Sequence, residues 1–249
     1  MTPEIRRVAD APALYQAAAV LFEHESAAAV RAGGVFNVAL AGGSTPRGLY
    51  RLLADNPHLR TAVPWDRIHF FWSDERHVPP DHPESNYRMA YEAMLSKVPV
   101  RVEYVHRIKA EHADAALVSG EYEADVRTSV PATSGVPRFD LILLGVGADG
   151  HTASLFPDTS ALSERARLVV ANRVGEMGTR ITMTLPLLNA ARLVMFLVAG
   201  EQKAEAVWRA LQPGSSEPAV PAALVQPVDG RLVWLLDSAA AGRLPKIPA

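Results

Sequence analysis

The sequence predicts an α/β fold with a mostly parallel sheet. Short apolar runs of strand length alternate along the chain with segments of helical periodicity, which is the pattern of repeated strand–helix units. Several of these runs lead directly into glycine-rich or charged turns, as parallel strands do where they end at a ligand-binding edge. At 249 residues the chain can bury a large core, and we expect residues 1–249 to form a single domain.

The first half of the chain opens with an alanine-rich segment whose apolar residues recur at helical spacing, and Gly33 and Gly34 mark its end. Further on, Ser85 and Asn86 are suitable caps for a helix whose apolar face we expect in the core. That face carries Tyr87, Tyr91, Met94 and Leu95. The expected strands of this half are 36–40, 68–72 and 102–105, and the expected helices are 10–32, 46–54, 86–95 and 111–127.

The second half continues the alternation after an irregular connector. Residues 180–185 alternate in polarity like a half-buried strand, whereas 193–199 are apolar throughout, like a buried one. The expected strands are 140–146, 168–171, 180–185, 193–199 and 231–236, the expected helices are 187–191 and 203–211, and the expected loops are 129–137 and 212–221.

Composition excludes several classes of function. Lysine and arginine total 25 and aspartate and glutamate 27, so a net charge of −2 offers no global field for nucleic acid or an anionic membrane. The chain has no cysteine, which excludes disulfides and thiolate chemistry. The N-terminal residues lack the features of a secretory signal, and no apolar run reaches membrane-spanning length. We therefore expect a cytoplasmic protein with neither nucleic-acid nor membrane partners.

A glycine-hydroxyl turn follows the first strand. Gly43, Ser44, Thr45 and Pro46 precede a helical segment, and Ser44 or Thr45 could cap that helix with Pro46 at its first position. The amides and dipole of a helix N-terminus also suit a phosphate, and the adjacent glycines favour that interpretation. The Walker lysine pattern is absent, so a nucleoside triphosphate is disfavoured.

The strand at 68–72 ends in a charged segment. Arg76 is a candidate for phosphate binding because a guanidinium matches the geometry of phosphate oxygens. A metal site would draw on the nearby acids and histidines, but their spacing is irregular and no metal-binding helix pattern occurs. Those residues are Asp74, Glu75, His77, Asp81 and His82. We expect no metal.

The strand at 140–146 leads into a glycine-rich turn that carries Asp149 and His151. Its glycines match a dinucleotide fingerprint, but Pro157 interrupts the helix that this motif requires, and no acid ends the next strand. Ser154 could suggest a serine hydrolase, yet the nucleophile elbow is absent. A histidine at a strand end, flanked by an acid, can instead activate water as a general base. We expect His151 to be catalytic.

Lys203 lies at the start of a helix that follows the strand at 193–199. The helix dipole disfavours a cation there, which suggests that Lys203 meets an anion. Four strand ends thus offer a glycine-hydroxyl turn, Arg76, the turn of His151, and Lys203. Together they predict a site for a phosphorylated metabolite.

Five segments resemble the 6-phosphogluconolactonase family and occur in its order. They are AGGSTP at 41–46, SDERHVPPDHPESNY at 73–87, LLGVGADGHTASLFP at 143–157, TRITMTLP at 179–186 and AGEQKA at 199–204. The resemblance spans nearly the whole chain. It implies a three-layer α/β/α fold with a Rossmann-like sheet, shared with glucosamine-6-phosphate isomerases. It also implies hydrolysis of 6-phospho-D-glucono-1,5-lactone, a sugar-phosphate lactone, to 6-phospho-D-gluconate in the oxidative pentose phosphate pathway.

The resemblance also assigns roles by matching position. His151 would deprotonate the attacking water, and Asp149 would shape the site beside it. The phosphate would be held by Gly43, Ser44, Thr45, Arg76, Arg180 and Lys203. No metal or cofactor is implied, because a lactone carbonyl is already electrophilic.

Two rivals remain. The sister deaminases have a segment resembling DGHIAFNEP, in which a glutamate completes an acid–histidine relay; here that position is Phe156, which argues against ring-opening isomerisation. A sugar-phosphate sensor related to bacterial repressors would carry an N-terminal DNA-binding segment, for which the sequence ahead of the first helix has no room. The oligomeric state is not predicted.

Overall fold

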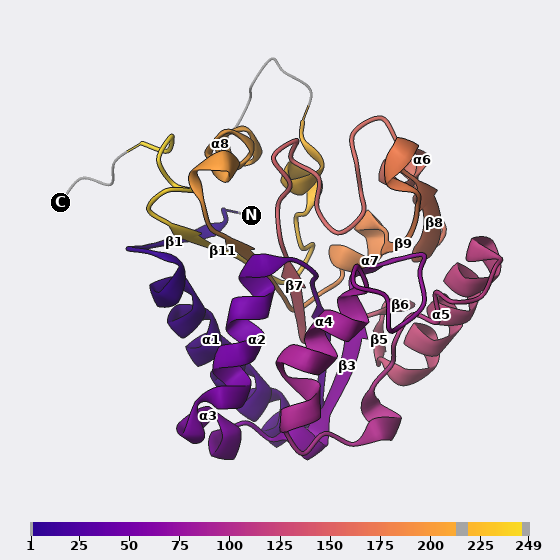
Figure 1. Cartoon of the computed structure of the whole chain (residues 1–249), viewed down its shortest axis with the longest axis horizontal. Coiled ribbons are helices and arrows are strands. Elements are labelled where there is room, and N and C mark those ends of the chain that lie inside the picture. The colour runs from indigo at the N-terminus through magenta and orange to yellow at the C-terminus, as the bar shows by residue number, and fades with distance from the viewer. Residues whose placement is uncertain (1, 213–218, 246–249) are drawn as a thin grey trace.

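The centre of the protein is a six-stranded parallel sheet with the order β1-β11-β10-β7-β2-β3 (Figure 1). The computed structural model describes residues 2–212 and 219–245. The strands are β1 (Glu4–Val8), β2 (Phe36–Leu40), β3 (Ile68–Trp72), β7 (Leu141–Leu144), β10 (Leu193–Val198) and β11 (Arg231–Asp237). Every neighbouring pair runs in parallel. With helices flanking this sheet, the predicted α/β/α class is confirmed.

The helices are α1 (Ala11–Gly33), α2 (Ser44–Asp55), α3 (Pro57–Ala62), α4 (Asn86–Ala93), α5 (Ala115–Ser129), α6 (Ser160–Ser163), α7 (Leu185–Leu188) and α8 (Ala204–Leu211). In Figure 1, α1, α2 and α4 form one layer, and α1 and α2 contact the sheet. The side chain of Asp10 accepts a hydrogen bond from the amide of Ala13 and so begins α1, and Gly34 ends it with a left-handed φ of 82°.

A second, antiparallel sheet stands beside the first. It contains β4 (Asp74–Arg76), β9 (Thr179–Met183) and β8 (Val169–Arg173), and α5 packs against β8 and β9. In the β4–β9 register, Asp74 is paired with Thr182 and Arg76 with Arg180. The two arginines therefore lie opposite one another on adjacent strands, two positions from the Asp74–Thr182 pair and on the same face of the sheet.

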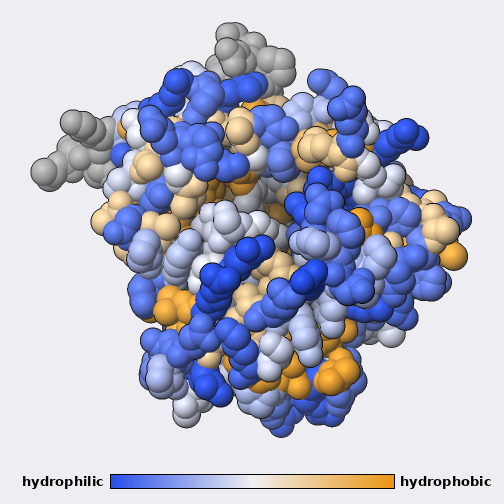
Figure 2. All heavy atoms as spheres, viewed as in Figure 1, coloured by the Kyte–Doolittle hydropathy of each residue, from blue (hydrophilic) through white to orange (hydrophobic). Residues whose placement is uncertain are grey.

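The core is continuous through the main sheet. Strands β2, β7 and β10 are buried at every position, which explains why, apart from Asn37, they are apolar without alternation. Phe196 and Trp234 stack on adjacent strands with ring centroids 4.0 Å apart. On the face shown in Figure 2, hydrophobic residues occur in small groups among hydrophilic ones. None of the helices in the described ranges has the length and apolarity that a membrane span requires.

Several predicted elements are corrected. Residues 102–105 do not form a strand, because Val102–Tyr104 form a 3-10 turn. The connector at 129–137 contains a hairpin of β5 (Ala132–Thr133) and β6 (Val136–Pro137). Helix α5 begins at 115 rather than 111, because the carboxylate of Asp114 accepts hydrogen bonds from two amides of its first turn. Tyr91 is 48% exposed rather than in the core. Of the predicted loop at 212–221, residues 213–218 lie outside the described residues.

A chain of titratable side chains connects β3 to α5. His69 Nδ1 lies 3.0 Å from His106 Nε2, and His106 Nδ1 lies 3.0 Å from Asp125 Oδ1. His69 also stacks on Tyr104, with ring centroids 3.8 Å apart. The pKa of His69 is lowered to about 4, mainly by burial and also by His106 and Arg101, while Asp125 acts in the opposite direction. The folded protein therefore keeps His69 neutral where an unfolded chain would protonate it.

This difference predicts a loss of stability in acid. As the pH falls from about 6.5 to about 4, the unfolded state binds a proton at position 69 that the folded state does not, so the free energy of unfolding decreases. We expect about 1–2 kcal/mol from this half-buried group, because solvent screens part of the effect. Urea unfolding of His69→Gln at pH 7 and pH 5 should show a smaller difference than wild type. The exposed His24→Gln is the control, and an unchanged difference in His69→Gln would contradict the expectation.

Candidate functional site

Residues from the four predicted strand ends line one pocket. Strands β10, β7, β2 and β3 are consecutive in the sheet, and the chain runs outward in opposite directions from the β7–β2 pair. Such a switch point is where open α/β sheets bind ligands, beyond the carboxyl ends of the strands. A pocket of about 190 Å³ lies there. It is lined by Ala41, Gly42, Gly43, Ser73, Asp74, Arg76, Asn86, Gly145, Val146, Gly147, His151, Ala153, Arg180 and Lys203.

His151 is held by the acid two residues before it. Its Nδ1 lies 2.6 Å from Asp149 Oδ1, and its backbone amide donates to the same oxygen at 3.1 Å. An ionised carboxylate only accepts, so Nδ1 carries the proton and Nε2 is left with a free lone pair. Burial raises the pKa of Asp149, but hydrogen bonds from His151 and its charge lower that pKa more, to below its usual range. The pair therefore has the arrangement of an oriented general base.

Glycines make this turn possible. A Cβ at position 147 would lie 2.1 Å from His151 Nδ1 and 2.4 Å from Asp149 Oδ1, so only glycine leaves room for the pair. Gly150 has a left-handed φ of 84°, and a Cβ there would lie 2.5 Å from Val220. The imidazole also stacks on Phe156, with ring centroids 4.0 Å apart. Contacts with Asp149 and Phe156 thus fix the position of the ring.

Three cations line the same pocket. Arg76 and Arg180 come from the paired strands β4 and β9, and Lys203 ends the 3-10 turn that leads from β10 into α8. Arg76 donates through Nη1 to the carbonyl of Glu84 at 2.7 Å. Within the described residues, the side chains of Arg180 and Lys203 have no hydrogen bond or ion pair, and the buried Nε atoms of both arginines have no partner. Unused donors remain for an anion.

The electrostatics of Arg180 point the same way. Burial lowers the pKa of its guanidinium, and the neighbouring charge of Arg76 lowers it further. Two guanidinium groups that repel each other at close range gain stability when an anion binds between them. An anion with several oxygens, such as a phosphate, would satisfy the free donors of both.

The glycine-hydroxyl turn differs in part from its prediction. Gly43 is the N-cap of α2, with a left-handed φ of 103°, and no side chain caps the helix. The predicted cap by Ser44 or Thr45 is therefore wrong, because both residues already lie inside the first turn. Gly43 lines the pocket, whereas Ser44 and Thr45 are adjacent to it in the chain and do not. Their hydroxyls remain available at the helix start.

Two buried acids precede Arg76, and their pattern in the sequence indicated only a disfavoured metal site. Glu75 accepts hydrogen bonds from the amides of Asn86 and Tyr87 and thus holds the start of α4. Burial raises the pKa of Glu75 above its usual value, although these hydrogen bonds act in the opposite direction. Asp74 lines the pocket and accepts from Ser154 Oγ at 2.6 Å. In the described part of the chain, no three histidines or acids are grouped so that they could hold a metal ion.

Asn86 is a pocket residue that the sequence indicated only as a cap. Its Nδ2 donates to the carbonyl of Asp74 at 2.9 Å, and the N-cap of α4 is Ser85. A Cβ at position 42 would lie 2.0 Å from Asn86 Oδ1, so Gly42 allows this side chain to approach β2. Ser85 and Asn86 were recognised in the sequence as caps, but the contact of Asn86 with Gly42 was not predicted.

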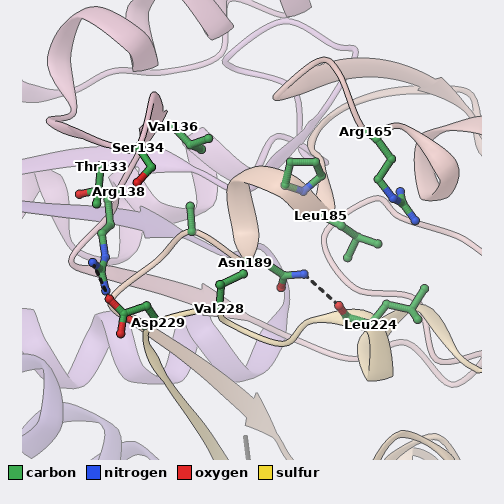
Figure 3. Close-up of a pocket in the computed structure, with 12 residues that line it drawn as sticks. Thr133, Ser134, Val136, Arg138, Arg165, Leu185, Asn189, Leu224, Val228 and Asp229 are labelled. Atoms are coloured by element: carbon green, nitrogen blue, oxygen red, sulfur yellow. Dashed lines mark hydrogen bonds and ion pairs between the residues drawn. The ribbon is translucent and has the colours of Figure 1, made fainter.

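A larger pocket of about 530 Å³ lies near the amino ends of β7, β10 and β11, at the opposite end of these strands from the first pocket (Figure 3). Its floor is largely apolar, with Val136, Leu185 and Val228. The guanidinium of Arg138 donates to Asp229, and Asn189 donates to the carbonyl of Leu224 (Figure 3). Among the described residues no histidine lines this pocket, and Arg138, although its buried Nε has no partner, is already bonded to Asp229. The smaller pocket is therefore the candidate active site.

Comparison with known proteins identifies the family of the chain. A family profile described as glucosamine-6-phosphate isomerases/6-phosphogluconolactonase matches residues 9–234. The chain belongs to this family. The resemblance predicted from the sequence motifs is thus confirmed.

Relatives in this glucosamine-6-phosphate isomerase/6-phosphogluconolactonase family match over most of their length. The 6-phosphogluconolactonase of Nostoc sp. is 43% identical over 218 residues, which cover 87% of this chain and 88% of the relative. That of Synechocystis sp. is 42% identical over 246 residues, covering 98% and 99%. The solved structure of 6-phosphogluconolactonase from Trypanosoma brucei has a TM-score of 0.88 at 30% identity and covers 98% of this chain and 99% of that one.

Proposed function

We propose that the protein hydrolyses 6-phospho-D-glucono-1,5-lactone to 6-phospho-D-gluconate, in the second step of the oxidative pentose phosphate pathway. The observation that carries the proposal is the pocket itself, which combines one oriented imidazole with three cations at adjacent strand ends. A sugar phosphate places an anion and a reactive carbonyl at opposite ends of one small molecule. The pocket offers complementary groups for both.

In this proposal His151 is the general base. Its Nε2 removes a proton from a water molecule as the water oxygen attacks the lactone carbonyl, and Asp149 holds the Nδ1 proton and stabilises the resulting imidazolium. When the tetrahedral intermediate collapses, the bond from the carbonyl carbon to the ring oxygen breaks. The imidazolium returns the proton to that oxygen, which becomes a hydroxyl group, and His151 is neutral again.

The phosphate anchors the other end of the substrate. Arg76, Arg180 and Lys203 would donate to its oxygens, and the first turn of α2, from Gly43 through Ser44 and Thr45, would add amides and hydroxyls. Binding energy from this remote group can hold the carbonyl close to the water that His151 activates. A positioned base and a fixed substrate are sufficient for an ester that is already electrophilic.

Phe156 favours hydrolysis over the isomerase chemistry of the sister enzymes. It stacks on His151, and at this position the resembling segment of the sister deaminases has a glutamate that completes the acid–histidine relay. A phenyl ring can confine the imidazole but cannot exchange a proton with it. The cytoplasmic location expected from the sequence stays a prediction.

The activity can be tested directly. The lactone is generated in situ by enzymatic oxidation of glucose 6-phosphate with NADP+, which accepts the two electrons. Once the oxidation is complete, acid release after addition of the purified protein is compared with the spontaneous rate. We expect clear acceleration by catalytic amounts of protein, and glucosamine 6-phosphate should release no ammonia. A rate equal to the background would refute the lactonase function, and ammonia release would favour the isomerase instead.

A further inference from the structure

Ser154 lies three residues after His151 and is fully buried, although the sequence singled it out only as a rejected nucleophile. All its polar groups are used. Its hydroxyl donates to Asp74 Oδ2 at 2.6 Å, its amide donates to Thr182 Oγ1 at 3.1 Å, and its carbonyl accepts from Asn172 Nδ2 at 2.8 Å. These partners lie on β4, β9 and β8, so one residue joins the turn of His151 to all three strands of the antiparallel sheet.

The turn that carries both residues is held by contacts of its own. Thr152 and Leu155 form an antiparallel bridge, and Thr152 Oγ1 donates to the carbonyl of Gly145 at 2.9 Å, which ties the turn to the end of β7. Ala153 has a left-handed φ of 47°, a conformation that costs free energy in a residue other than glycine. Ala153 precedes Ser154 in the chain, at the point where the backbone turns so that the side chain of Ser154 enters the interior.

The partners of Ser154 are directly connected to the phosphate-binding arginines. Asp74 and Thr182 form one cross-strand pair of β4 and β9, and Arg76 and Arg180 form the pair two positions along. Any shift of the His151 turn relative to the Asp74–Thr182 pair is therefore also a shift relative to the two guanidinium groups. The hydrogen bond from Ser154 to Asp74 is short and involves a carboxylate, the strong class of such bonds.

We infer that Ser154 is a positioning residue that sets the distance between the base His151 and the arginine pair that holds the phosphate. Its hydroxyl reaches no reacting atom. Ser154 fixes the turn of His151 relative to the strand pair that carries Arg76 and Arg180. A substrate held at its phosphate by the two arginines then presents its carbonyl to the water at His151. This inference rests on the proposed lactonase function, and it assigns to the buried Ser154–Asp74 bond a role that depends on the phosphate.

The test compares two lactones that differ only in the phosphate, 6-phospho-D-glucono-1,5-lactone and D-glucono-1,5-lactone. In Ser154→Ala, kcat/KM for the phosphorylated lactone should fall about 10- to 100-fold, since a misplacement of about 1 Å can have an effect of that size. For the lactone without phosphate it should fall less than about threefold, because that substrate is not fixed by the arginines. The inhibition constant of inorganic phosphate should not change, because the arginines themselves remain.

The matched control is Ser119→Ala, which removes another fully buried serine hydroxyl with a single hydrogen bond, in α5. It should leave both rates at the wild-type value. Ser154→Cys keeps the size of the side chain but donates weakly, and it provides a second variant if Ser154→Ala folds poorly. The cysteine variant should show the same selective loss.

The outcomes are distinct. A selective loss on the phosphorylated lactone supports the inference. An equal loss on both lactones would show that Ser154 is only a structural residue and would overturn the inference. Unchanged rates on both lactones would overturn it as well. A wild-type protein inactive on the phosphorylated lactone refutes the proposed function itself, and the positioning role fails with it.

Discussion

Replacement of His151 by glutamine should nearly abolish turnover. Nε2 of His151 is the free basic nitrogen that Asp149 orients, and glutamine offers an amide of similar size that cannot accept a proton at neutral pH. We expect kcat/KM for the phosphorylated lactone to fall about 10²- to 10⁴-fold, the usual contribution of a general base. The loss is measured by continuous acid release with the spontaneous rate subtracted.

Two further measurements separate chemistry from folding. The midpoint of thermal unfolding should stay near that of wild type, since His151 is partly exposed, and inorganic phosphate should bind the variant with unchanged affinity. The control is His82→Gln, a histidine of the charged segment after β4 that does not line the pocket. A His151→Gln enzyme within a few-fold of wild type would remove His151 as the base.

Much of the fold could be predicted because its strands are short, apolar and followed by glycine turns. β2, β7 and β10 are buried on both faces, and their composition shows it directly. β1 could not be predicted in this way, since Glu4–Val8 contains three charged residues in five. It lies at the edge of the sheet, where one side of the strand faces solvent and charges are tolerated.

The site could be predicted in its parts but not in its connections. His151 and Asp149 are two residues apart, so their contact was a local expectation, and strand ends indicated Arg76 and Lys203. Ser154 and Asp74 are separated by 80 residues, and nothing in either segment indicates the other. Their hydrogen bond depends on the antiparallel pairing of β4 with β9, which sequence periodicity does not specify. Local sequence patterns therefore predict the helices, the strands and the residues at strand ends. They do not predict the contacts between distant segments that set the geometry of the site.

Replacement of Arg180 by alanine should mainly weaken substrate binding. Its guanidinium is half-buried, has no hydrogen bond or ion pair to any described side chain, and lies opposite Arg76 at the pocket wall. A hydrogen bond between charged groups contributes about 1.5–3 kcal/mol, so we expect KM to rise about 10- to 100-fold. The inhibition constant of inorganic phosphate should rise by a similar factor, whereas kcat should change less, because His151 and Asp149 remain in place.

The matched control is Arg173→Ala, which removes the same charge from the exposed end of the neighbouring strand β8, outside the pocket. It corrects for any loss of long-range attraction between the protein and an anionic substrate, an effect that added salt should also reduce. The difference between the two variants in KM and in phosphate inhibition is therefore the contribution of Arg180 itself. Equal values for the two variants would show that the phosphate does not bind at Arg180. Arg76→Ala should resemble Arg180→Ala, because the two guanidinium groups face the same anion from paired positions on β4 and β9.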